Sequence, residues 1–158
     1  MPSPEHAADL ERVLARAAQE CALRAEIWFG TGLPQALRSA IQAQGKSRDQ
    51  GPAQLAFVEV RAVSPQGCAI SDGDLSGLRC PVIGLSAATL GDLASLVGPQ
   101  SESGIQITRL ICPVAVFDFS ADGVRVREVR HGLTAADLQR RLSVPLWSGP
   151  DLRELGSH

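Results

Sequence analysis

The longest run of apolar positions lies at residues 107–119 and is rich in β-branched side chains. Such a run predicts a buried strand, here with a kink or an edge position where Cys112-Pro113 interrupts it. Residues 120–123 carry the Asp and Gly of a tight turn, and from Val124 onward apolar and polar positions alternate. Because alternation is typical of a half-exposed strand, this segment predicts two strands joined by a tight turn.

Apolar positions at helical spacing appear elsewhere. Residues 10–21 place Leu, Val, Ala and Cys on one face of a helix, and Arg16 lies with other charged residues on the opposite face. Residues 88–97 form a second amphipathic pattern, which stops at a Gly-Pro pair. Thr134 stands three residues before Asp137, as a helix N-cap stands before an acidic first turn. We therefore predict helices at these places.

The succession of strand and helix patterns predicts the fold class. Residues 25–29 predict a short strand, Gly30-Thr31-Gly32 a sharp turn, and Pro34 the first turn of a helix. Further strands are predicted at residues 54–63 and 81–85. This order predicts an α/β fold, a three-layer αβα open sheet that is mostly parallel with an antiparallel hairpin near the carboxy terminus.

Composition and charge narrow the classes of function. With 44% hydrophobic content, residues 1–158 are long enough to form a single domain with a sizeable core. The formal net charge of −2 argues against nucleic acid or an anionic membrane surface as the main partner. No stretch has the length of a membrane span or the pattern of a signal peptide, so we expect a soluble cytoplasmic protein.

The cysteines form no metal-binding pattern. Cys21, Cys68, Cys80 and Cys112 contain no C-x-x-C pair, and no histidine stands at zinc-finger spacing. Each cysteine lies in or beside an apolar run, which is typical of a buried free thiol. We expect no metal site and no metal cofactor.

Four segments of the chain resemble the β subunit of family I CoA-transferases. VAVFDF and the later HGLTAADLQRRLSVPL are similar to the carboxy-terminal end of that subunit. FGTGLP is similar to the glycine turn after its first strand, residues 54–70 to a following strand and turn, and VIGLSAATLGDLASLV to its glycine-rich loop and helix. The segments follow the family's order over most of the chain. The resemblance implies a CoA-transferase-like fold, a coenzyme A thioester as substrate without a further cofactor, and assembly with an α-like subunit.

The catalytic glutamate of the family has no clear counterpart in the sequence. In the family, a glutamate of an E-S/N-G motif, on a loop after the second sheet strand, attacks the acyl-CoA carbonyl and carries CoA as a thioester. Residues 44–53 contain no glutamate, and residues 85–88 replace the glycine-rich loop that supplies amides. Glu102 begins a Glu-Ser-Gly triplet, but late in the order, where a solvated connector is the plainer interpretation. His131 is a candidate general base, against the plainer interpretation of a surface histidine.

Three functions follow from these observations. The first is a shortened β subunit that pairs with an α-like subunit for CoA transfer or hydrolytic ring-opening cleavage, with the essential carboxylate on the partner. The second is an active CoA-transferase that uses Glu102, and the third is a structural or regulatory pseudo-subunit. We expect a homo- or hetero-oligomer. We place the substrate contact at Gly30, Thr31 and Gly32, because a glycine turn before a helix exposes amides that favour anions.

Overall fold

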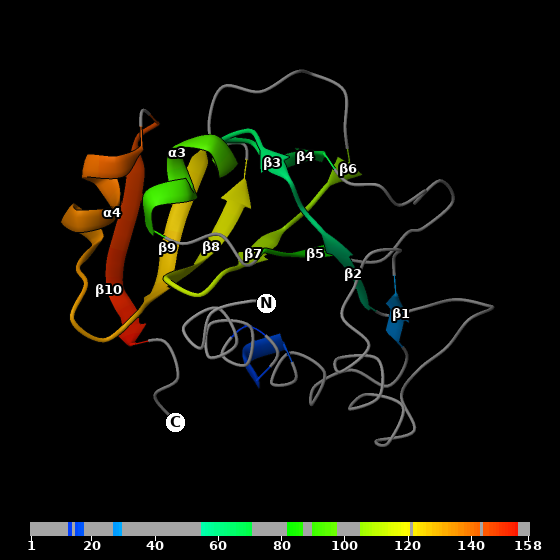
Figure 1. The fold of residues 1–158 in the computed structure, drawn as a ribbon, viewed down its shortest axis with the longest axis horizontal. Coiled ribbons are helices and arrows are strands. Elements are labelled where there is room, and N and C mark those ends of the chain that lie inside the picture. The colour runs from blue at the N-terminus through cyan, green and yellow to red at the C-terminus, as the bar shows by residue number, and fades with distance from the viewer. Residues whose placement is uncertain are drawn as a thin grey trace, which may run out of the picture.

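The computed structural model describes residues 13, 15–17, 27–29, 55–70, 82–86, 90–97, 105–120, 122–142 and 144–154. Seven of the described strands form one sheet in the order β1-β2-β5-β7-β8-β9-β10 (Figure 1). Their bounds are Ile27–Phe29, Leu55–Glu59, Val82–Leu85, Arg109–Ile111, Ala115–Ser120, Gly123–Val129 and Leu146–Glu154, in that order. Neighbours are parallel except in the β7–β8 and β8–β9 pairs. The predicted α/β class, mostly parallel with an antiparallel hairpin towards the carboxy terminus, is confirmed.

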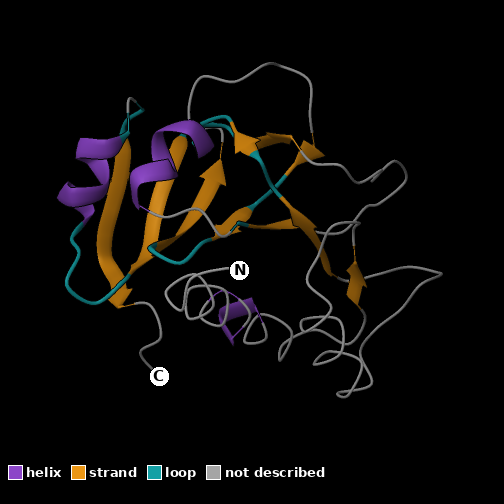
Figure 2. Cartoon of the chain, viewed as in Figure 1, coloured by secondary structure: helices purple, strands orange, loops and turns teal. Residues whose placement is uncertain are grey.

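Helices and a small second sheet cover one face of the large sheet (Figure 2). The small sheet is antiparallel, in the order β3-β4-β6, with bounds Ala62–Val63, Cys68–Ile70 and Ile105–Gln106. The helical elements are the 3-10 turn η1 at Leu90–Asp92, α3 at Leu93–Leu96 and α4 at Ala135–Arg141. Leu93 of α3 and Leu138 of α4 are fully buried in one cluster with Phe117 and Val126 of the sheet. This cluster is the main core.

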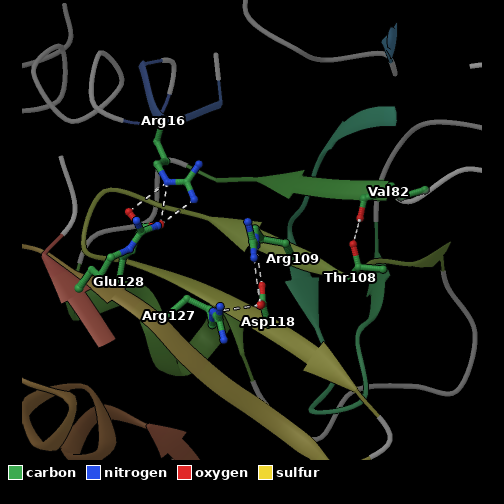
Figure 3. Close-up of polar contacts among 8 residues, drawn as sticks. Arg16, Val82, Thr108, Arg109, Asp118, Arg127 and Glu128 are labelled. Atoms are coloured by element: carbon green, nitrogen blue, oxygen red, sulfur yellow. Dashed lines mark hydrogen bonds and ion pairs between the residues drawn. The ribbon is translucent and has the colours of Figure 1, made fainter. Parts of the chain in front are cut away.

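Helical residues near the amino terminus lie against the opposite face. A bulge in β9 permits the contact, because Val116 pairs with Glu128 while Phe117 pairs with Val126, leaving Arg127 as an extra residue. Val126 faces the main core, so Arg127 and Glu128 both project from the other face. There Arg16 binds Glu128 (Figure 3). The predicted polar placement of Arg16 is wrong, since its exposed fraction is 6%.

The predicted single kinked strand at residues 107–119 is also wrong. The structure divides it into β7 and β8, which pair antiparallel with Ile111 opposite Val116. The chain reverses at Cys112-Pro113, where the amide of Cys112 donates to the carbonyl of Ala115 at 3.1 Å. Both strands lie inside the sheet, so the residues of the reversal are apolar as well. No polar residue in the sequence therefore marks the turn.

The carboxy-terminal region holds one helix that confirms its prediction and one strand that was not predicted. Thr134 caps α4 through a reciprocal capping box with Asp137, as predicted. Beyond α4, the nine-residue strand β10 pairs in parallel with β9 at the sheet edge. Gly149-Pro150 lies within β10 and is a typical turn signal, which masked the strand. None of the described helices has the length and apolar character needed to cross a membrane.

Candidate active site at the carboxyl ends of the parallel strands

A row of side chains crosses the sheet near the carboxyl ends of its parallel strands. Pairing joins Glu59 to Leu85, Leu85 to Ile111, Ile111 to Val116, and Val116 to Glu128. None of these five belongs to the main core cluster, so this cross-sheet row lies on the face opposite α3 and α4. Because open α/β sheets bind ligands beyond the carboxyl ends of their strands, the exposed end of the row is a candidate site.

Glu59 occupies that exposed end as the last residue of β2. Its neighbours Val58 and Val60 are buried in the main core, whereas Glu59 itself is exposed. Within the described part of the chain, no hydrogen bond or ion pair engages the Glu59 carboxylate. An accessible carboxylate at the end of a central parallel strand has the freedom that a nucleophile or general base requires.

Backbone amides next to Glu59 are already used by the sheet. The amide of Val60 donates to the carbonyl of Leu85 at 2.9 Å, and that of Ser86 donates to the carbonyl of Ile111 at 3.0 Å. Gly84 has a packing role, because a Cβ there would overlap Cγ2 of Val60. These residues therefore build the strand ends and supply no oxyanion donor from the Val60 and Ser86 amides.

Cys112 lies close to the same sheet edge but is not a nucleophile. Its side chain is fully buried, and its thiol donates a 3.2 Å hydrogen bond to the carbonyl of Ala115. Burial raises the pKa of the Cys112 thiol from 9.0 to about 11, so the thiolate is absent near neutral pH. The predicted buried thiol is confirmed at Cys112, while Cys68 is only half-buried.

His131 follows β9, which lies far from β1 in the order of the sheet. Its ring is exposed, and Nδ1 lies 3.0 Å from Oε2 of Glu154. The hydrogen bond and the charge of Glu154 raise the His131 pKa, which favours the imidazolium and leaves less of the neutral ring to accept a proton. Five strand spacings of ~4.8 Å separate β1 from β9, or roughly 24 Å, so the structure does not bring His131 to the end of β1.

Other predicted site residues lie outside the described residues. These are Gly30, Thr31, Gly32 and Glu102, together with Cys21 and Cys80. The strand that leads into the glycine turn is described, and its last residue Phe29 pairs with Phe57, two residues before Glu59. Among the described residues, no group of three or more His, Cys, Asp or Glu side chains is arranged to hold a metal ion.

Solved structures of similar fold define the architecture. The acyl-CoA transferase YdiF from Escherichia coli O157:H7 matches with a TM-score of 0.68 at 12% identity, covering 92% of this chain and 43% of that chain. The chain has a CoA-transferase-like fold. The decarboxylase AibA/AibB matches with a TM-score of 0.65 at 13% identity, covering 94% of this chain and 89% of that chain. IpdAB of Rhodococcus jostii RHA1 matches at 0.66 and 10% identity, covering 94% and 88%.

The comparisons of sequence give no match, whereas the comparison of structures does. No family model matches the chain, and no curated protein matches it. With identities of 10–13%, the likeness to these solved structures shows the CoA-transferase-like fold alone.

Glu59 was not predicted as a site residue. The resemblance placed the catalytic glutamate within residues 44–53, which contain none, whereas the second strand of the sheet is Leu55–Glu59 and ends on a glutamate. Val60-Arg61 follows instead of the E-S/N-G triplet, so no motif marks the position. The available signal was a charged residue at the end of an apolar, strand-like run.

Proposed function

We propose that the chain is a β-type subunit that pairs with an α-like subunit in an acyl-CoA-processing enzyme. The CoA-transferase-like fold supports the substrate class, since one neighbour is an acyl-CoA transferase. The names AibA/AibB and IpdAB each join an A and a B component. In both comparisons, 94% of this chain aligns with one chain of the solved structure. These likenesses support a two-component assembly.

The position of Glu59 carries the proposal. It is an exposed carboxylate at the end of β2, and β2 lies beside the strand that leads into the predicted glycine turn. We assign the acyl-CoA carbonyl to this place, with Gly30, Thr31 and Gly32 as the substrate contact. Because the Val60 and Ser86 amides are occupied, the oxyanion donors come from the glycine turn or from the α-like subunit.

The bonds that form and break in the first half-reaction belong to Glu59 and the thioester. A carboxylate oxygen of Glu59 bonds to the thioester carbonyl carbon while the C–S bond breaks, giving a mixed anhydride and CoA thiolate. The thiolate then attacks the Glu59 carbonyl carbon, and the acyl group leaves as its carboxylate. CoA remains on Glu59 as a thioester. In CoA transfer, a second carboxylate takes the CoA from the Glu59 thioester. In hydrolysis, water cleaves that thioester and releases CoA.

Trapping tests this role of Glu59. The complex with its α-like subunit is incubated with an acyl-CoA and then with hydroxylamine or borohydride, and peptide mass spectrometry locates the label. We expect the label on Glu59, and Glu59→Gln lowers turnover by orders of magnitude. Glu154→Gln is the matched control, because Glu154 is exposed at the end of an edge strand in the same sheet. Full turnover of an assembled Glu59→Gln complex contradicts the proposal.

That contrary result supports a second function, a non-catalytic subunit with the essential carboxylate on the partner. The occupied Ser86 amide favours it, because Ser86 lies in the segment that resembles the family's glycine-rich loop and its amide is already used by the sheet. A label found on the α-like subunit identifies this case directly. A label on Glu102 instead identifies the alternative nucleophile.

The edge strand β10 supplies the contact surface that we propose for the α-like subunit. Trp147 is 63% exposed and pairs across the strands with Arg125, beside a hollow of about 580 Å³. Tryptophan and arginine are the residues that most often dominate interface energies. Pro150 lacks an amide, and the β9–β10 register shifts between Ser148 and Arg153, so simple extension of the sheet is disfavoured there. The partner therefore docks on the Trp147 face.

Substitution of Trp147 tests this surface. We expect Trp147→Ala to weaken assembly with the α-like subunit by about 2 kcal/mol or more, measured by titration calorimetry of the two purified subunits. Ile70→Ala is the control, since Ile70 is the other exposed large apolar side chain of the described residues, at 38%, and lies on the small sheet. Equal loss of affinity in both variants, or none in Trp147→Ala, contradicts the assignment.

A further inference from the structure

The connection between α4 and β10 is held together by one side chain, Gln139. This residue is half-buried near the end of α4. Its Nε2 donates to the carbonyl of Val144 at 2.8 Å and to that of Leu142 at 3.4 Å. Its Oε1 accepts from the amide of Leu146, the first residue of β10, at 2.7 Å. A single carboxamide therefore joins the helix to the strand through both its donor and its acceptor.

These contacts lie where regular structure stops. The last carbonyls of a helix and the outer groups of an edge strand have no partners within their own elements, so a side chain or water has to satisfy them. Pro145 stands between Val144 and Leu146, and it has no amide and a fixed φ. The connection is therefore short of backbone donors, and Gln139 supplies the contact that fixes its two ends.

The core holds Gln139 in place. Leu138, the preceding residue of α4, is fully buried, and Leu142 and Val144 are 7% and 6% exposed. All three belong to the main core cluster. Because α4 and the connection pack against this cluster, the 2.7 Å contact to the Leu146 amide carries their order to the start of β10.

Trp147 follows Leu146 directly and has few contacts of its own. Its side chain is 63% exposed and lines the hollow of about 580 Å³. A Cβ at Gly123 would lie 3.8 Å from the indole Nε1, so the ring lies beside the glycine of the β8–β9 turn. Within the described part of the chain, no hydrogen bond or ring contact restrains the indole. Its position therefore depends on the backbone that carries it, which Gln139 fixes one residue earlier.

We propose that Gln139 is a positioning residue for the subunit contact, because it fixes the start of β10 and so holds Trp147 beside the hollow. This role rests on the proposed function, in which an α-like subunit docks on the Trp147 face. A partner that meets an ordered indole does not have to order it on binding, so a fixed Trp147 raises affinity without adding a contact. Gln139 acts only through Trp147.

NMR relaxation of the indole N–H groups tests the positioning on the chain alone. The chain holds two tryptophans, Trp28 in β1 and Trp147, and Trp147→Phe assigns the two signals. Gln139→Met is similar in volume and removes all three hydrogen bonds. We expect a more mobile Trp147 indole and an unchanged Trp28. Unchanged relaxation of Trp147 would overturn the proposal.

Gln106→Met is the matched control for this measurement. The Gln106 amide also holds two backbone carbonyls, at 2.8 and 3.1 Å, but at the small sheet. Gln106→Met should leave the Trp147 indole as in the wild type, and equal mobility in both variants would contradict the proposal. Gln139→Glu keeps an acceptor for the Leu146 amide and should loosen Trp147 less than Gln139→Met does. Unchanged circular dichroism of each variant excludes loss of the fold as the cause.

Titration calorimetry with the purified α-like subunit connects the positioning to assembly. We expect Gln139→Met to weaken binding by about two- to tenfold, less than Trp147→Ala, since a loosened side chain must be ordered on binding. Unchanged affinity in Gln139→Met, when Trp147→Ala weakens assembly, overturns the role of Gln139 alone. Unchanged affinity in Trp147→Ala overturns the docking surface itself, and with it the role of Gln139 in assembly.

Discussion

Glu59 and Glu128 end the same cross-sheet row, yet their surroundings are opposite. Glu128 is 4% exposed and receives three hydrogen bonds from Arg16. Glu59 is exposed, and within the described residues its carboxylate has no such contact. Since a buried charge must be paired whereas an exposed one need not be, Glu128 belongs to the framework and Glu59 remains available for a ligand. Burial, more than residue type, separates the structural carboxylate from the candidate catalytic one.

Replacing Glu59 and, separately, Glu128 by glutamine tests this contrast most strongly. Glu128→Gln removes a carboxylate that binds the buried guanidinium of Arg16, with side chains that are 7% and 5% exposed. Breaking one partner of a buried pair costs about 3–5 kcal/mol. Glu59→Gln, at an exposed position, should change the free energy of unfolding by less than about 0.5 kcal/mol. Urea denaturation of the two variants measures both values.

Two outcomes would contradict this contrast between Glu59 and Glu128. Similar, small losses in both variants would mean that Arg16 and Glu128 are not held together in solution. A large loss in Glu59→Gln would mean that Glu59 is part of the framework, and a fall in its turnover would then not identify a nucleophile. A double variant that replaces both Arg16 and Glu128 by residues of similar volume separates the pair's interaction from the cost of leaving one charge unpaired.

Local signals in the sequence predicted much of the fold. The N-cap at Thr134 and the β-strand at residues 81–85 depend on neighbouring residues, and both are confirmed. The reversal at Pro113 was missed because β7 and β8 are both buried, so no polar residue marks the turn between them. The fold class followed from the order of elements, which survives such errors in single boundaries.

The sites depended on distant residues and were therefore not predicted. Arg16 and Glu128 are 112 residues apart, and a lone arginine on a helix gives no sign of its partner. Glu59 acquires its candidate role only because β2 lies between β1 and β5, an arrangement that no spacing in the sequence expresses. Strand order and register, not composition, assemble both ends of the cross-sheet row.

Asp137 represents an intermediate case, a half-buried carboxylate that is hydrogen-bonded within the helix cap. Its oxygen Oδ2 accepts from the amide of Thr134 at 2.9 Å and from the Thr134 hydroxyl at 3.0 Å. Thr134→Ala should cost about 1 kcal/mol of stability, because the hydroxyl that accepts from the Asp137 amide is lost. Equilibrium unfolding in urea measures this, and Thr108→Ala, which removes a 3.4 Å contact to the carbonyl of Val82, should cost less.

The pH dependence of this cap follows from the same contacts. Hydrogen bonds from Thr134 lower the pKa of Asp137 below its ordinary 3.8. A group with a lowered folded-state pKa stabilises the fold above its unfolded pKa and loses that contribution as pH falls through the folded value. The window therefore lies below pH 3.8. In Thr134→Ala the Asp137 pKa, followed by NMR, should move back towards 3.8, and an unchanged value would show that the cap does not form.

The smallest effect is expected at the exposed pair of His131 and Glu154. Their side chains are 86% and 52% exposed, so water competes for the 3.0 Å contact and its contribution to stability is slight. The contact nevertheless raises the His131 pKa above 6.5, mainly through the hydrogen bond to Glu154. A raised folded-state pKa gives stability that is present below the unfolded pKa and is lost as pH rises through the folded value. NMR titration should therefore show His131 above 6.5 in the wild type and closer to 6.5 in Glu154→Gln, with turnover unchanged. A wild-type pKa at or below 6.5, together with loss of turnover in His131→Asn, would return His131 to the role of general base and would place catalysis far from Glu59.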